Sequence, residues 1–199
     1  MTTNDQVYIE KIINGDTNAF SILVERYKDL VYTLAIRMVK HKEEAEEITQ
    51  DTFIKAYKSI HKFKGDSKFS TWIYRVAYNT CLDAIKKHKK LQSNVPINEY
   101  TEHEVKAINN ALDIMEAKER SVVIKNCIEK LPSEDAFLMT LYYYEELSLD
   151  EIADITGLKA NNVKVKLFRS RKKLATILKK ELDNETIESY GTTYRTAFE

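Results

Sequence analysis

Apolar residues recur every three or four positions over long stretches of this chain, and no other feature constrains its fold as strongly. Over residues 20–38 one series of apolar residues follows this spacing: Phe20, Leu23, Tyr27, Leu30, Leu34 and Met38. Steps of three and four place such residues on one face of an α-helix for about five turns. The chain has only four Gly and two Pro in 199 residues. A β-rich fold needs more turn residues than this, so we predict an all-α protein.

Breaks in this periodicity divide the chain into two expected helical domains. Residues 1–90 can form a small bundle of long helices. The stretch Gln-Ser-Asn-Val-Pro, which ends at Pro96, then interrupts the helical pattern, because Pro lacks an amide donor and restricts the residue before it. We therefore expect a flexible linker over 91–124, a second helical domain over 125–182 and a poorly ordered tail over 183–199.

Several classes of protein are excluded by the same sequence. It has no apolar run close to the roughly 20 residues that span a bilayer, and its first residues lack the basic and apolar regions of a signal peptide. We therefore expect a cytoplasmic protein without membrane insertion. Cys81 and Cys127 have no second Cys or His at metal-ligand spacing, so we expect reduced, buried thiols, no metal site and no cofactor.

Charge is segregated along the chain although the formal net charge is zero. Residues 43–51 hold five acids and no Lys or Arg, whereas residues 62–90 hold eight bases and two acids. Residues 159–180 hold nine bases and no acid. Two basic segments separated by an acidic middle suit a chain that binds a polyanion at two places.

The strongest local pattern is LSLDEIADITGLKANNVKVKLFRSRKKLATIL at residues 147–178. Ser148 and Glu151 have the spacing of a capping box, and Gly157 permits a tight turn between two helices. This pattern predicts a helix-turn-helix whose second helix lies in the DNA major groove. Its Arg, Lys and Asn side chains can read base edges or neutralise phosphates. The expected outward, DNA-binding positions are Lys159, Asn161, Asn162, Lys164, Lys166, Arg169, Ser170, Arg171 and Lys172.

A second candidate nucleic-acid site combines the loop at 64–68 with the basic segment that follows it. Aromatic rings can stack on unpaired bases while lysines hold the backbone, and Tyr74 and Tyr78 are the better candidates for exposure. Trp72 is at least as well explained by core packing, because it lies beside Phe69 at helical spacing. The loop offers backbone amides and short polar side chains that could enclose one flipped base.

Taken together, the chain resembles the sigma-70 family of RNA polymerase sigma factors, in the minimal extracytoplasmic-function (ECF) group. EEAEEITQDTFIKAY at 43–57 resembles conserved region 2.2, and FKGDSKFSTWIYRVAYNTCLDAIKK at 63–87 resembles regions 2.3 and 2.4. Residues 131–174, which include the predicted helix-turn-helix, resemble region 4. The resemblance implies a promoter-specificity factor with a region 2 domain over 1–90, which binds polymerase and melts the minus-10 element, and a region 4 domain over 125–182, which reads the minus-35 element.

The resemblance also implies partners and site residues. The partners are promoter DNA, core RNA polymerase through its β′ clamp helices and β flap, and an anti-sigma factor. For the minus-10 element it implies Lys64, Gly65, Asp66, Ser67, Lys68, Tyr74, Arg75, Tyr78, Asn79, Lys86 and Lys87. For polymerase binding it implies Glu47, Gln50, Asp51, Phe53, Ile54 and Tyr57.

Two other functions are open to such a chain. A stand-alone helix-turn-helix regulator would account for residues 131–180 but would leave the basic segment at 62–90 and the acids at 43–51 unexplained. An enzyme would need a constellation of reactive groups. The four His residues, His41, His61, His88 and His103, lie far apart in sequence, and none stands beside a nucleophile or metal motif. We therefore expect no catalytic residues.

Overall fold

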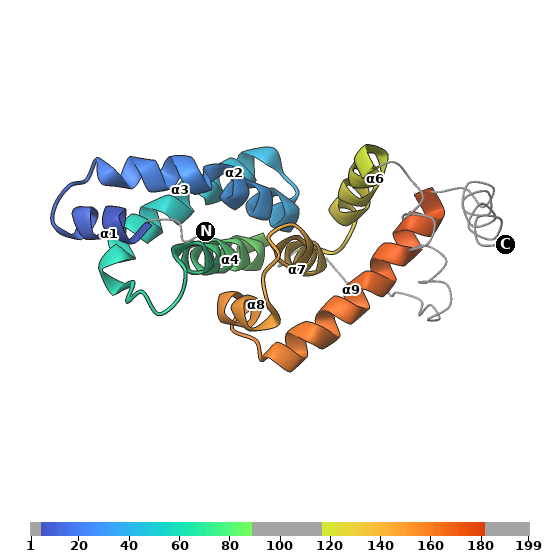
Figure 1. Cartoon of the computed structure of the whole chain (residues 1–199). Helices are drawn as coiled ribbons and strands as arrows, with labels where there is room; N and C mark the ends of the chain where they lie inside the picture. The colour runs from blue at the N-terminus through green and yellow to red at the C-terminus, as the bar shows by residue number, and fades with distance from the viewer. Residues whose placement is uncertain (1–4, 89–116, 182–199) are drawn as a thin grey trace. The chain divides into compact units, whose positions relative to one another are not determined.

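The computed structural model describes residues 5–88 and 117–181, and every regular element in these ranges is helical. The helices are α1 (Asp5–Ile13), α2 (Ala19–Val39), α3 (Lys42–Ser59), the 3-10 turn η1 (Ile60–Lys62), α4 (Phe69–His88), α6 (Ala117–Glu129), α7 (Ser133–Tyr143), α8 (Leu149–Thr156) and α9 (Ala160–Glu181) (Figure 1). The prediction of an all-α fold is confirmed. Of the predicted linker, residues 91–116 lie outside the described residues, as does the tail 183–199.

Helices α2, α3 and α4 pack against one another, with α1 against α2 (Figure 1). Of the apolar stripe predicted for α2, Leu23, Tyr27, Leu34 and Met38 are buried, and Phe20 and Leu30 are half-buried. Aromatic side chains extend the core between α2 and α4, where the ring centroids of Tyr27 and Phe69 lie 5.5 Å apart. These contacts hold the three long helices in one bundle, which presents the outer faces of α3 and α4.

The chain divides into two compact units, and each unit consists of two segments that are separate in the sequence. One unit joins residues 1–92 to 140–163, so that α8 packs against α4, and the other joins 93–139 to 164–199. In the second unit, α6 and α7 bury Cys127, Ile128 and Phe137, and α9 buries Leu167 and Leu178. The functional domains expected at 1–90 and 125–182 stay a prediction.

None of the described helices is long and apolar enough to cross a membrane. Both cysteines are buried, as the sequence predicted. Burial raises the pKa of the Cys81 thiol to about 12, so this group stays protonated at neutral pH. No cluster of metal-ligating side chains occurs in the described part of the chain.

Candidate nucleic-acid interface

The C-terminal basic surface lies on α9, which begins shortly after a sharp turn. Glycine occupies the left-handed conformation that ends α8, with a φ of 73° at Gly157. Most side chains have a strong steric penalty there, which is why the turn needs glycine. Of the predicted minus-35 positions, the structure exposes Lys159, Asn161, Asn162, Lys164 and Arg169 and leaves Lys166, Arg171 and Lys172 half-buried.

Ser170 is different, because its side chain faces inward. Its hydroxyl is fully buried and donates to Oδ1 of Asp135 on α7 at 2.6 Å and to the carbonyl of Lys166 at 2.9 Å. The expectation that Ser170 is an outward, DNA-facing residue is therefore wrong. The physical reason is its spacing: it follows the buried Leu167 by three positions and precedes the buried Leu174 by four.

Acidic residues at the start of α7 bind the inner edge of the basic helix. Asp135 also accepts a hydrogen bond from Nζ of Lys173 at 2.6 Å, and Glu134 pairs with Nζ of Lys166 at 2.8 Å. Asp135 thus bonds a hydroxyl and an ammonium group one turn apart on α9. These contacts fix the rotation of α9 about its own axis, and therefore which side chains it presents outward.

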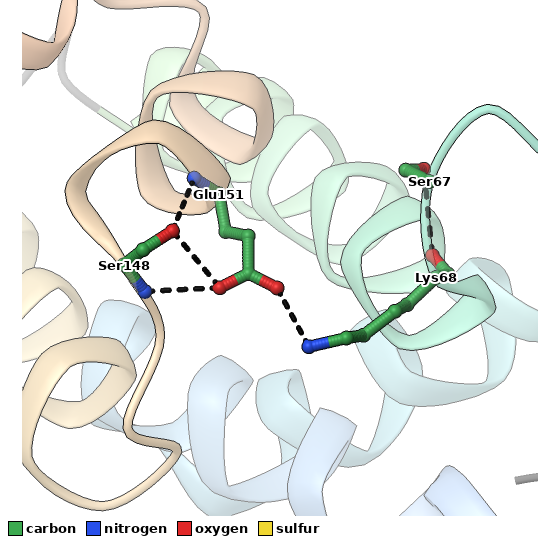
Figure 2. A network of polar contacts seen from close by, with 4 residues as sticks. All are labelled: Ser67, Lys68, Ser148 and Glu151. Atoms are coloured by element: carbon green, nitrogen blue, oxygen red, sulfur yellow. Dashed lines mark hydrogen bonds and ion pairs between the residues drawn. The ribbon is translucent and has the colours of Figure 1, made fainter. Parts of the chain in front are cut away.

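The second candidate surface begins at the loop between η1 and α4. All five predicted loop residues, Lys64, Gly65, Asp66, Ser67 and Lys68, are exposed. Figure 2 shows the hydroxyl of Ser67 near the carbonyl of Lys68, at 3.4 Å, and the ammonium group of Lys68 bonded to the carboxylate of Glu151 at 2.8 Å. The loop therefore presents polar groups to solvent while one of its lysines is paired.

Glu151 belongs to the capping box that the sequence predicted for α8. Its backbone amide donates to the Ser148 hydroxyl at 3.2 Å, and its carboxylate accepts from the Ser148 backbone amide at 3.0 Å (Figure 2). Lys68 and the cap together hold the pKa of the Glu151 carboxyl below its ordinary value. The Glu151 carboxylate thus accepts a hydrogen bond from the Ser148 amide that caps α8, and it also neutralises Lys68.

Helix α4 presents only part of its predicted aromatic and basic surface. Of the predicted residues on this helix, Arg75, Asn79, Lys86 and Lys87 are exposed. Tyr74 and Tyr78 are only 3% and 8% exposed, so the expectation that these rings face solvent is wrong. Tyr74 packs on Tyr27 with ring centroids 6.4 Å apart, and it hydrogen-bonds the carboxyl of Glu145. Burial raises the pKa of both groups in that hydrogen bond.

Trp72 lies in an aromatic group at the start of α4. Its ring is half-buried, and its centroid lies 5.6 Å from that of Phe63 and 5.5 Å from that of Phe69. These contacts agree with core packing, which explains this residue at least as well as base stacking does. The aromatic group supports the base of the 64–68 loop.

The predicted polymerase-binding residues form a ridge along α3. The exposed members are Glu47, Gln50, Asp51, Ile54 and Tyr57, whose spacing of three and four places them on one helix face. Phe53 is buried behind them, with its ring centroid 6.4 Å from that of Phe20. Ile54 is half exposed in the middle of this acidic and polar face. Tyr57, 40% exposed, is a second large side chain with apolar surface on this face.

Two kinds of residue at these surfaces are not among those predicted from the sequence. Asp135 is one, because its role depends on a contact between helices that are distant in sequence. Val165 and Phe168 are the other, and they are among the large apolar side chains that the structure exposes. The helical period of α9 indicates that both side chains are exposed, because both lie away from the buried positions of this helix.

Comparison with known proteins gives two family matches and relatives that align over most of the chain. The family models of Sigma-70 region 2 and Sigma-70, region 4 match residues 23–91 and 121–174. The ECF RNA polymerase sigma factor SigW of Bacillus subtilis (strain 168) is 37% identical over 172 residues, which cover 83% of this chain and 92% of that protein. The ECF RNA polymerase sigma-E factor of Escherichia coli (strain K12) is 34% identical over 173 residues, covering 84% and 90%.

Solved structures show the same fold at lower sequence identity. The structure of CnrH in complex with the cytosolic domain of CnrY has a TM-score of 0.60 and 20% identity, covering 88% of this chain and 97% of that one. The sigma factor RpoE in complex with the anti-sigma factor NepR from Bartonella quintana has a TM-score of 0.56 and 18% identity, covering 80% and 96%. The helical arrangement of this chain is therefore similar to theirs.

Proposed function

Because this chain belongs to the ECF group of sigma-70 RNA polymerase sigma factors, we propose that the surfaces described above carry out its promoter-specificity function. The chain binds core RNA polymerase, recognises the minus-35 and minus-10 elements and directs transcription initiation. The observation that carries the assignment of surfaces is the outer face of α9. Among the side chains described over 160–178, the exposed ones are Lys, Arg, Asn and two apolar residues.

The minus-35 element is read by α9 in the major groove. Asn162 and Arg169 are exposed on the same side of α9, about two turns apart, and their amide and guanidinium groups suit adenine and guanine edges respectively. Lys164 lies to one side of them and contacts phosphate, which adds affinity without sequence preference. Lys166 contributes less to base reading than the other predicted residues, because it is already paired with Glu134.

The minus-10 element is bound by the 64–68 loop and the exposed side of α4. Arg75 and Asn79 lie four positions apart on that side, so they can hold one strand while the loop encloses a single base. Lys86 and Lys87 extend the same helix with further positive charge. Tyr74 and Tyr78 support this surface from below, because their rings are buried.

Core polymerase is bound by the ridge on α3 that contains Gln50, Asp51 and Ile54. Acidic and polar groups around an exposed apolar side chain suit the β′ clamp helices that the family resemblance implies, and region 4 is expected at the β flap. The chain acts in the cytoplasm as a binding protein and not as an enzyme. An anti-sigma partner is supported by the fold shared with RpoE, whose structure was solved with one.

The test of this function is a competition assay for core polymerase with the full chain. The double variant Gln50→Ala and Asp51→Lys should bind core at least several-fold more weakly, because a buried interfacial charge reversal is costly. Asp29→Lys, which makes the same charge change at an exposed position of α2, is the matched control and should bind normally. Unchanged affinity of the double variant, with its helix content intact, would remove the α3 ridge from the polymerase interface.

A further inference from the structure

Two exposed apolar side chains interrupt the polar outer face of α9. Val165 is 42% exposed and Phe168 is 49% exposed. The positions that this helix buries along the same stretch are Val163, Leu167, Ser170 and Leu174. At 100° per residue, Val165 lies almost diametrically opposite the mean direction of those buried positions. It therefore occupies the centre of the outward face and not its edge.

The neighbours of Val165 include amide and guanidinium groups, which can bind nucleic acid. Positions three and four residues before and after it on the helix surface are Asn161, Asn162, Phe168 and Arg169, and all four are exposed. The ring of Phe168 lies beneath the ammonium group of Lys172, with Nζ 4.9 Å from the ring centroid. No acid occurs between residues 159 and 180. Amides, bases and one ring thus surround a single branched apolar side chain.

The chemistry of valine limits what this side chain can recognise. Valine can neither donate nor accept a hydrogen bond, so it cannot bind phosphates or the polar atoms of a base edge. In the major groove the apolar group that it can contact is the C5-methyl group of thymine. With the proposed function as premise, we infer that Val165 selects a thymine at one position of the minus-35 element by packing on its C5-methyl group. Phe168 shields one side of that contact.

The occupant is DNA and not a protein partner because of the charge around the site. Protein-binding surfaces are depleted of lysine at their centre, whereas here Lys164 and Lys172 lie beside the apolar pair. Duplex DNA has phosphates that suit the lysines, and the thymine methyl group in its major groove suits the apolar pair. A methyl group at the same place also occurs in 5-methylcytosine, and the experiment separates that source from thymine.

The experiment measures binding of the full chain, assembled with core RNA polymerase, to promoter duplexes. Each thymine of the minus-35 element is replaced in turn by deoxyuridine, which removes the methyl group and changes nothing else on the base edge. One replacement should weaken binding by about three- to fivefold, the loss expected for one methyl-sized apolar contact. A duplex with 5-methylcytosine paired to guanine at that position keeps the methyl and should show whether the methyl alone suffices.

The variant Val165→Ala should bind the thymine duplex several-fold more weakly and lose the difference between thymine and deoxyuridine. It should fold, because the position is exposed and alanine favours helix more than valine does. Val7→Ala changes a similarly exposed valine on α1, 39% exposed, and should behave as the unaltered chain. Lys164→Ala should weaken binding to both duplexes alike, since its phosphate contact does not depend on the methyl group.

Three results would overturn the inference. The methyl group could prove irrelevant at every thymine, or its effect could persist in Val165→Ala. Val165→Ala could instead leave the duplexes unaffected and weaken binding to core polymerase, which would assign this face to a protein. In each case promoter-specific binding by the unaltered chain would keep the proposed function intact, whereas the loss of all promoter preference would remove both.

Discussion

The carboxylate of Asp135 holds the orientation of α9, the helix that we propose reads the minus-35 element, and its removal is a direct test of that role. Asp135 accepts two hydrogen bonds from α9, one from the hydroxyl of Ser170 and one from the ammonium group of Lys173, both at 2.6 Å. Its side chain is only 13% exposed. In Asp135→Ala, both donors on α9 lose a charged acceptor.

The expected cost follows from these two bonds. Hydrogen bonds to a charged group contribute about 1.5 to 3 kcal/mol each. Ser170 keeps its second acceptor, the carbonyl of Lys166, and Lys173 reaches solvent, so neither bond counts in full. We expect Asp135→Ala to lower the free energy of unfolding by about 2 kcal/mol. Asp135→Asn, which keeps one acceptor for Ser170, and Ser170→Ala, which removes one bond, should each cost about 1 kcal/mol.

Two measurements check this prediction. Urea unfolding followed by far-ultraviolet circular dichroism gives the free energies, and binding to minus-35 duplexes of different sequence gives the base preference. Asp135→Ala should reduce the preference among duplexes more than it reduces overall affinity, because the rotation of α9 is no longer fixed. A stability loss of less than about 0.5 kcal/mol, the range of neutral surface changes, would refute the role given to this carboxylate.

Two further changes test the turn before α9 and the polar contact on α8. Gly157→Ala should lower the free energy of unfolding by about 1 to 2 kcal/mol, because φ is 73° at this position. An added Cβ would meet no atom within 4 Å, so the cost comes from backbone strain alone. A cost near zero would show that the turn does not need glycine. A double-mutant cycle of Lys68→Met and Glu151→Gln should give a coupling below about 1 kcal/mol, since Lys68 is largely exposed. The pKa of the Glu151 carboxyl is lowered from its ordinary value of 4.5. The ion pair therefore stabilises the fold above pH 4.5, and this stabilisation is lost as the pH falls below that value. A coupling that persists in acid would contradict this ion pair.

The helical architecture could be predicted from the sequence because apolar period and turn residues act locally. Ser148, Glu151 and Gly157 form the cap and turn that their spacing predicted. The exposure of Tyr74 was mispredicted because it depends on a tertiary contact: its hydroxyl meets Glu145, which reaches α4 only through the packing of α8. No local pattern contains that information.

The errors on α9 have another cause. Ser170 was placed outward because serine is polar, although its spacing from Leu167 and Leu174 puts it on the buried stripe. Val165 was passed over because valine is apolar, although it lies opposite that stripe. In both cases the helical period predicts the burial of the side chain better than the residue type does. The burial of Ser170 is possible because Asp135 accepts a hydrogen bond from its hydroxyl. The identity of that partner was available only from the folded chain.

The most direct test of the account is run-off transcription with purified core RNA polymerase that carries no other sigma factor. The template holds the minus-35 and minus-10 elements that the chain selects from a randomised promoter library. We predict one specific transcript that requires the chain, that is reduced by Gln50→Ala with Asp51→Lys, and that starts at a fixed distance from the minus-10 element. Promoter binding by the chain without any specific transcript would contradict the account and would favour a stand-alone DNA-binding regulator.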